Sequence, residues 1–82
     1  MEQIKKKLAN EVKTIGLLTE TISPERYDED ILLSGMIDSF GFVQFLTFVE
    51  SEYEIDITEE MQFEDRLRTI NGMAELIQET SV

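Results

Sequence analysis

Cysteine and histidine are both missing from this chain of 82 residues. Without cysteine the chain has no disulfide and no thiolate nucleophile, and without histidine it has no imidazole general base. Zinc sites built from these two residue types are excluded for the same reason. The composition therefore excludes most hydrolytic mechanisms, and we expect neither enzymatic activity nor a metal site.

Long apolar runs are also missing, since uninterrupted apolar stretches stop at three or four residues, as at 31–33. No segment is long enough to predict a transmembrane helix. The first ten residues contain charges but neither the apolar segment nor the small-residue cleavage site of a secretory signal. We therefore expect a cytoplasmic protein that does not associate with membranes.

Basic residues are scarce: seven lysines and arginines face 18 aspartates and glutamates, for a net charge of −11. Nucleic acid and anionic membranes would repel such a chain. Twelve acidic residues and no basic one lie between Arg26 and Arg66, a stretch that should present a negative field to basic partners. An acidic surface that only maintains solubility explains the same charge. The triplet 28–30 lacks the ligand spacing of an EF-hand, and we interpret it as a surface cluster.

Hydrophobic periodicity predicts one helical domain spanning residues 1–82. The first helix should run from Glu2 to Ile15, with Gly16 as its C-cap. Residues 17–38 form a long connection whose apolar residues should pack onto the core, with a short helical turn around 24–30. The apolar stripe of the first helix consists of Ile4, Leu8, Val12 and Ile15. The apolar residues of the connection are Leu17, Leu18, Ile31, Leu32, Met36 and Ile37.

A second helix should begin at Asp38 or Ser39, either of which can act as its N-cap, and end near residue 52 or 53. Thr58 can cap a short third helix, and Thr69 caps a fourth that ends near Thr80. The core-facing arc of the second helix is predicted to hold Phe42, Phe45, Leu46, Val49 and Tyr53, and the outward arc Phe40, Val43, Gln44, Thr47 and Ser51, with Phe48 at its flank. The expected fold is an all-α small four-helix bundle, with three principal helices and one short helix.

Ser39 is the candidate functional residue, since it follows an acid and precedes a large hydrophobic residue at the opening of an apolar helix. A hydroxyl at this place can bear a phosphodiester, whose charge meets the free N–H groups and the positive end of the helix dipole. The alternative is that Ser39 is only a helix cap.

Residues 35–40, Gly-Met-Ile-Asp-Ser-Phe, followed by Val-Gln-Phe-Leu at 43–46, resemble the attachment motif of acyl carrier proteins, Asp-Ser-Leu before a long helix. The resemblance covers nearly the whole chain: a first helix, a long loop, the serine at the head of the second helix, the acidic-aromatic-aliphatic segment 51–57, a short helix and a last one. It implies a four-helix bundle of acyl carrier protein type and a single carrier domain.

The resemblance further implies that a phosphopantetheinyl transferase, using coenzyme A and Mg²⁺, attaches 4′-phosphopantetheine to Ser39. Asp38 would help to position the serine or the metal of the transferase. Acyl groups would then ride as thioesters on the arm, and a monomeric carrier would present them to acyl-loading and acyl-transferring enzymes of fatty acid, lipid or polyketide biosynthesis.

Two further sets of residues follow from the resemblance. The residues expected to meet partner enzymes are Phe40, Val43, Gln44, Thr47 and Glu50. The residues expected to wall a pocket for an acyl chain, or else to form ordinary core, are Phe42, Leu46, Val49, Ile57, Leu67, Ile70 and Met73.

The chain departs from the family at the positions two and five after the serine, which are acidic in carriers of fatty acid synthesis and are Gly41 and Gln44 here. Docking would then rest more on Phe40 and Val43, which favours a dedicated partner. Gly41 also costs the helix about 1 kcal/mol relative to alanine. Asp-Ser-Phe-Gly resembles, in addition, carriers of D-alanine for cell-wall polymers. A D-alanyl or other aminoacyl carrier, and an unmodified acidic adaptor that binds basic helices, are the alternatives.

Overall fold

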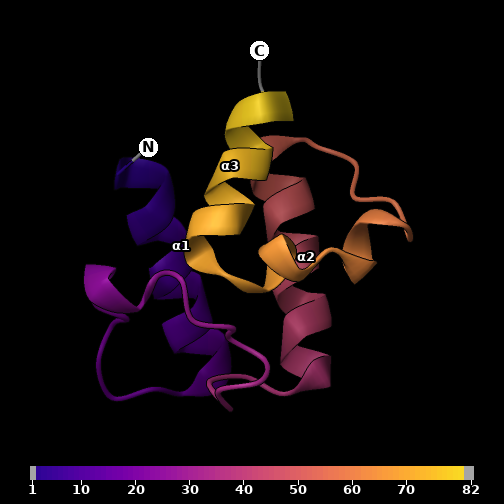
Figure 1. Ribbon diagram of the computed structural model, residues 1–82. Coiled ribbons are helices and arrows are strands. Elements are labelled where there is room, and N and C mark those ends of the chain that lie inside the picture. The colour runs from indigo at the N-terminus through magenta and orange to yellow at the C-terminus, as the bar shows by residue number, and fades with distance from the viewer. Residues whose placement is uncertain (1, 81–82) are drawn as a thin grey trace.

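Three α-helices form the frame of the molecule in the computed structural model, which describes residues 2–80 apart from the side chain of Phe63. They are α1 (Glu2–Gly16), α2 (Ser39–Tyr53) and α3 (Ile70–Thr80). Helix α1 packs against both others, and in Figure 1 it runs downward whereas α2 and α3 run upward. The all-α prediction is confirmed, and the predicted helix bounds differ from the observed ones by a residue or so.

The predicted short third helix is wrong, and two 3-10 turns, η2 (Met61–Phe63) and η3 (Asp65–Arg68), take its place. Thr58 does cap the segment, because its Oγ1 accepts a hydrogen bond from the N–H of Met61 at 3.2 Å. The backbone then continues through i→i+3 bonds, from Glu64 to Met61 and from Leu67 to Glu64. These bonds turn the chain so that Leu67 becomes fully buried. The molecule is therefore a compact all-α domain of three helices and short 3-10 turns.

One hydrophobic core joins the three helices and the connections between them. The predicted apolar faces are confirmed for most positions; Ile4, Ile15 and Tyr53 are only partly buried. Among the described residues no polar or charged residue is buried as a whole, although two single atoms are, the hydroxyl oxygen of Tyr53 and the amide oxygen of Asn71. The largest fully buried side chains are Phe45, Leu8, Ile31, Leu67, Ile70, Met73, Ile77, Val12 and Val49.

The end of α1 differs from the prediction at Gly16. The left-handed residue is Leu17, with a φ of 54°, and the N–H groups of Leu17 and Leu18 close the helix by bonding to the carbonyls of Thr14 and Lys13. Gly16 is required for another reason: a Cβ there would lie 2.2 Å from the carbonyl oxygen of Met36. The glycine therefore permits a close backbone approach, and the strained cap conformation falls on an exposed leucine.

The long connection between α1 and α2 packs onto the core as predicted, through Ile31, Met36 and Ile37. Leu17 is an exception, because 89% of its surface is exposed. The helical turn expected around 24–30 is a 3-10 turn, η1 (Pro24–Arg26). Within residues 2–80, no helix has the length and apolarity to cross a membrane.

Asp30, interpreted from the sequence as part of a surface cluster, is a half-buried anchor of this connection. One carboxylate oxygen accepts hydrogen bonds from the N–H groups of Leu32 and Leu33, and the other lies 2.7 Å from Nε of Arg68. Burial raises the pKa of Asp30, but the hydrogen bonds from Leu33, Arg68 and Leu32 outweigh it and hold the pKa below its usual value. The Ile31 N–H also donates to the Arg68 carbonyl at 2.7 Å. Asp30 thus ties the segment that leads to α2 to the start of α3.

Candidate functional site

Asp38, rather than Ser39, is the N-cap of α2. Its backbone is extended, and its Oδ1 accepts a hydrogen bond from the N–H of Gly41 at 2.7 Å. Its carbonyl accepts the first helical hydrogen bond, from the N–H of Phe42 at 2.9 Å. A carboxylate in this position satisfies one of the free N–H groups of the first turn and complements the helix dipole. The sequence left both residues open as caps, and the geometry assigns the role to Asp38.

Ser39 is the first residue of α2, and its side chain is exposed. No hydrogen bond joins its hydroxyl to a described residue, and the capping is performed by Asp38. A phosphodiester on this oxygen would extend into solvent beside the positive end of a helix of 15 residues, whose first turn contains no acidic residue. The position is therefore sterically open to a covalently attached phosphate group, which would lie beside the Asp38 carboxylate that caps the helix.

The start of α2 is held against the end of α1 by Gly41, which is buried. A Cβ at this position would lie 2.8 Å from Cγ2 of Ile15 and 3.2 Å from Cβ of Ile37. The glycine thus lets the two helices approach closely, and this contact explains a residue that lowers helix propensity. The segment before Ser39 is fixed as well, because Ile37 is buried and its N–H donates to the Ile31 carbonyl at 3.2 Å.

Most of the predicted docking residues share the outward face of α2. Phe40 is 77% exposed and Val43 60% exposed, which are high values for such large apolar side chains. Gln44 and Thr47 are exposed on the same helix. Glu50 differs from them: it is half-buried, and its carboxylate accepts a hydrogen bond from the N–H of Ile57 at 3.1 Å. We call the apolar pair Phe40 and Val43 the predicted docking patch.

The seven residues expected to wall an acyl pocket are all buried, and they belong to the one core cluster. Leu67, Ile70 and Met73 are fully buried between α3 and its neighbours. The structure thus brings the set together in one packed core. An acyl chain would have to displace these side-chain contacts in order to enter.

Ion pairs occupy most of the basic side chains. Arg26 pairs with Glu29, and Arg66 pairs with Glu64 and Glu79. Lys7 of α1 pairs with Glu52 of α2. Hydrogen bonding to its carboxylate partner is the main cause that raises the pKa of each of these three basic side chains. Within residues 2–80 no group of three acidic side chains is arranged to hold a metal ion.

Comparisons with protein-family models, with curated proteins and with solved structures found no match for this chain. The site therefore stands on its own residues and geometry. Sequence reasoning missed Asp30 as the anchor of the connection that leads to Ser39. An aspartate before a turn that ends in Ser34-Gly35 is a local sequence signal for hydrogen bonds from its carboxylate to the backbone. Its ion-pair partner Arg68 lies 38 residues away, and no local pattern in the sequence predicts that pairing.

Proposed function

We propose that this protein is a carrier of acyl carrier protein type, which bears 4′-phosphopantetheine on Ser39 and performs no chemistry of its own. The observation that carries the proposal is that Asp38 and Ser39 have different roles at the start of α2. Asp38 caps the helix, and the exposed hydroxyl of Ser39 is left without a structural role. The resemblance of the surrounding motif to the attachment site of acyl carrier proteins supports the same function.

In the attachment reaction, Ser39 Oγ attacks the phosphorus that bears the pantetheine unit of coenzyme A. The bond from this phosphorus to the adenosine bisphosphate breaks, and the hydroxyl proton passes to a base of the transferase. Asp38, solvated beside the serine, orients it or binds the Mg²⁺ of the transferase. The arm supplies a terminal thiol for thioester chemistry, and since the chain has no cysteine this would be its sole thiol.

The predicted docking patch supports a particular kind of partner. Partner enzymes that recognise Phe40 and Val43 need an apolar recess, and the absence of an acid at Gly41 reduces the need for basic residues around it. This surface favours a dedicated acyl-transferring partner over general fatty acid machinery. The resemblance of Asp-Ser-Phe-Gly at 38–41 to carriers of D-alanine favours a D-alanyl or other aminoacyl carrier as the second candidate.

Intact-mass spectrometry tests the attachment. After incubation with a phosphopantetheinyl transferase, coenzyme A and Mg²⁺, the protein should gain the mass of one phosphopantetheine, and the Ser39→Ala variant should gain none. Ser34→Ala is the matched control, because Ser34 is also exposed but lies outside the motif. A wild-type chain that stays unmodified with transferases of differing specificity would instead support the unmodified adaptor.

Loading of the modified protein distinguishes the two cargo classes. Incubation with fatty acyl or with amino acid adenylating enzymes, followed by mass spectrometry, should show which thioester forms on the arm. We expect acyl transfer to exceed aminoacyl transfer. The reverse result would identify the aminoacyl carrier.

A further inference from the structure

A surface depression of about 240 Å³ lies on the side of α1 that faces the long connection, and no residue of α2 lines it. Its lining comes from three places in the sequence: the first half of α1, the turn η1 with the tyrosine that follows, and the start of α3. The lining residues are Glu2, Lys5, Lys6, Pro24, Tyr27 and Asn71. Because the backbone bond from Asn71 N–H to the Tyr27 carbonyl joins two of these places, the depression belongs to the folded frame.

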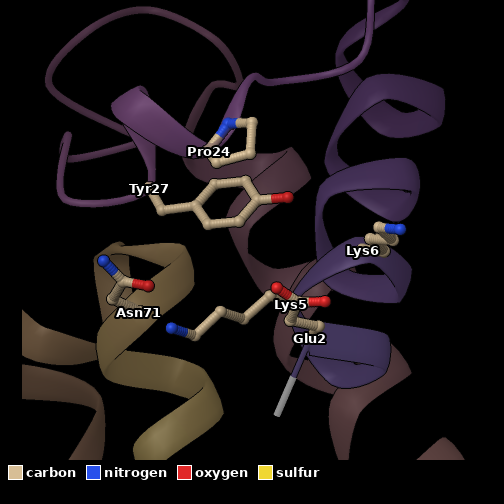
Figure 2. A pocket seen from close by; sticks show the side chains of 6 residues that line it. All are labelled: Glu2, Lys5, Lys6, Pro24, Tyr27 and Asn71. Atoms are coloured by element: carbon tan, nitrogen blue, oxygen red, sulfur yellow. The ribbon is translucent and has the colours of Figure 1, made fainter.

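Tyr27 combines a buried ring with an unused hydroxyl. Only 8% of the residue is exposed, and no hydrogen bond joins its hydroxyl to a described residue; the hydroxyl is not among the buried oxygens without a partner, so it reaches solvent. Figure 2 shows the ring beside Pro24, with the hydroxyl pointing toward α1 across the depression. A hydroxyl that reaches solvent at the edge of a depression can exchange its water for a ligand. This donor is therefore available to a ligand.

Two lysines add positive charge to the same depression. Lys5 and Lys6 form no ion pair with any described residue, although acidic residues greatly outnumber basic ones in this chain. In Figure 2 the Lys5 side chain extends across the depression toward Asn71. The amide oxygen of Asn71 is buried and has no hydrogen-bond donor, while its amide nitrogen donates to Asp28 at 2.7 Å. Asn71 therefore contributes an acceptor, and the donors that the depression offers an anion are the ammonium of Lys5 and the phenol of Tyr27, beside the apolar surface of Pro24.

We propose that this depression binds a carboxylate attached to an apolar or aromatic group. The carboxylate would accept hydrogen bonds from Lys5 and Tyr27, and the apolar group would lie against Pro24 and the tyrosine ring. The volume suffices, because a cavity of about 150 Å³ already holds a benzene ring. A singly charged carboxylate fits better than a phosphate dianion, because Glu2 lines the same depression and the whole chain carries a net charge of −11.

Two sources can supply this chemistry: a free aromatic acid, or the C-terminal carboxylate of a protein that ends in an aromatic residue. Phenylacetate represents the first source, and the dipeptide Ala-Phe with a free carboxylate represents the second. Phenylacetamide and the amidated dipeptide are the neutral counterparts. The depression is open to solvent, so we expect half-saturation in the millimolar range.

The test is a titration of the unmodified full-length protein, labelled with ¹⁵N, followed by NMR. The expected result is saturable shifts of the backbone amides of Tyr27 and Asn71 with at least one carboxylate, and none with its neutral counterpart. Lys5→Gln should weaken the binding about fivefold, the loss of one exposed charged contact. Tyr27→Phe should weaken it also, without loss of fold, because the hydroxyl supports no internal contact.

Lys13→Gln is the matched control, since Lys13 is a lysine of the same helix outside this depression. It should leave the binding unchanged. Saturation with phenylacetate alone would identify a small-molecule site, and saturation with the dipeptide alone would identify a C-terminus as the ligand. Shifts that do not saturate, equal shifts with the neutral compounds, or equal weakening by Lys13→Gln would overturn the proposal. Since the unmodified protein is used, none of these results bears on the attachment of an arm to Ser39.

Discussion

Because Asp38 caps α2 and Ser39 does not, alanine substitutions at these two neighbouring positions should have opposite effects on stability and on modification. Asp38→Ala removes the 2.7 Å bond to the Gly41 N–H and a negative charge at the positive end of α2. A cap is worth about 1 kcal/mol, and a charge near the dipole about 0.5 kcal/mol more. The expected loss of about 1.5 kcal/mol corresponds to a fall in Tm of roughly 6–12 °C for a domain of this size. Ser39→Ala removes an exposed hydroxyl without a partner and should change stability by less than about 0.5 kcal/mol.

Thermal and urea unfolding followed by circular dichroism measure this difference, and mass spectrometry after treatment with transferase supplies the second readout. Ser39→Ala should abolish the mass gain with its Tm unchanged. Asp38→Asn retains a capping oxygen and loses the charge, so it should keep most of the stability and reveal whether the charge assists modification. If Ser39→Ala were the destabilising variant and Asp38→Ala the neutral one, the assignment of the cap would be wrong. Capping of α2 would then be a sufficient explanation for Ser39.

Three further predictions concern other parts of the chain. Leu17→Gly should raise the free energy of unfolding, measured by urea denaturation, by about 0.5–1 kcal/mol, because it relieves a left-handed leucine that is 89% exposed. Gly16→Ala should lower the free energy of unfolding, because its Cβ would clash with the Met36 carbonyl. If both variants were more stable than the wild type, the roles assigned to Gly16 and Leu17 at the end of α1 would be wrong. Asp30→Asn should cost about 1–2 kcal/mol at neutral pH. The pKa of Asp30 is lower in the folded state than in the unfolded state, so the carboxylate stabilises the fold at pH values above its unfolded pKa near 3.9. This stabilisation is lost as the pH falls through the folded pKa, and plots of unfolding free energy against pH for variant and wild type should therefore converge below about pH 4. Plots that stay parallel would refute this. Phe40→Glu should leave the circular dichroism spectrum and Tm unchanged and impair loading by the partner enzyme, with Phe40→Leu as the control that retains loading.

Local signals in the sequence were sufficient for the helices and for their first residues. The apolar periodicity places α1, α2 and α3 within a residue or so of their observed bounds. Thr69 caps α3 as predicted, since its Oγ1 accepts a hydrogen bond from the Gly72 N–H at 2.9 Å. Capping chemistry acts over three residues, and a short window of sequence therefore contains what is needed to predict it.

Contacts between distant segments decided the features that the sequence did not reveal. A threonine cap followed by two acids favours a helix after Thr58, but the burial of Leu67 imposes two tight 3-10 turns instead. Gly16 is a residue type that commonly ends a helix, but the structure requires a glycine there because the Met36 carbonyl approaches it closely. Asp30 and Arg68 form an ion pair although 38 residues separate them in the sequence, and no local pattern around either residue predicts the pair.

The same kind of contact limits how partners can recognise α2. An acidic side chain at position 41 would place its Cβ 2.8 Å from Cγ2 of Ile15, so a charge there requires the Ile15 side chain, or α1 with it, to shift. Glu50 is bonded to the backbone of the following loop, and Glu52 is paired with Lys7 of α1. A basic partner surface would therefore have to compete with contacts that already hold the domain together, which reduces the net gain from each ion pair. The exposed Phe40 is under no such restriction, so in the proposed carrier recognition through this turn would rest on apolar contact more than on charge.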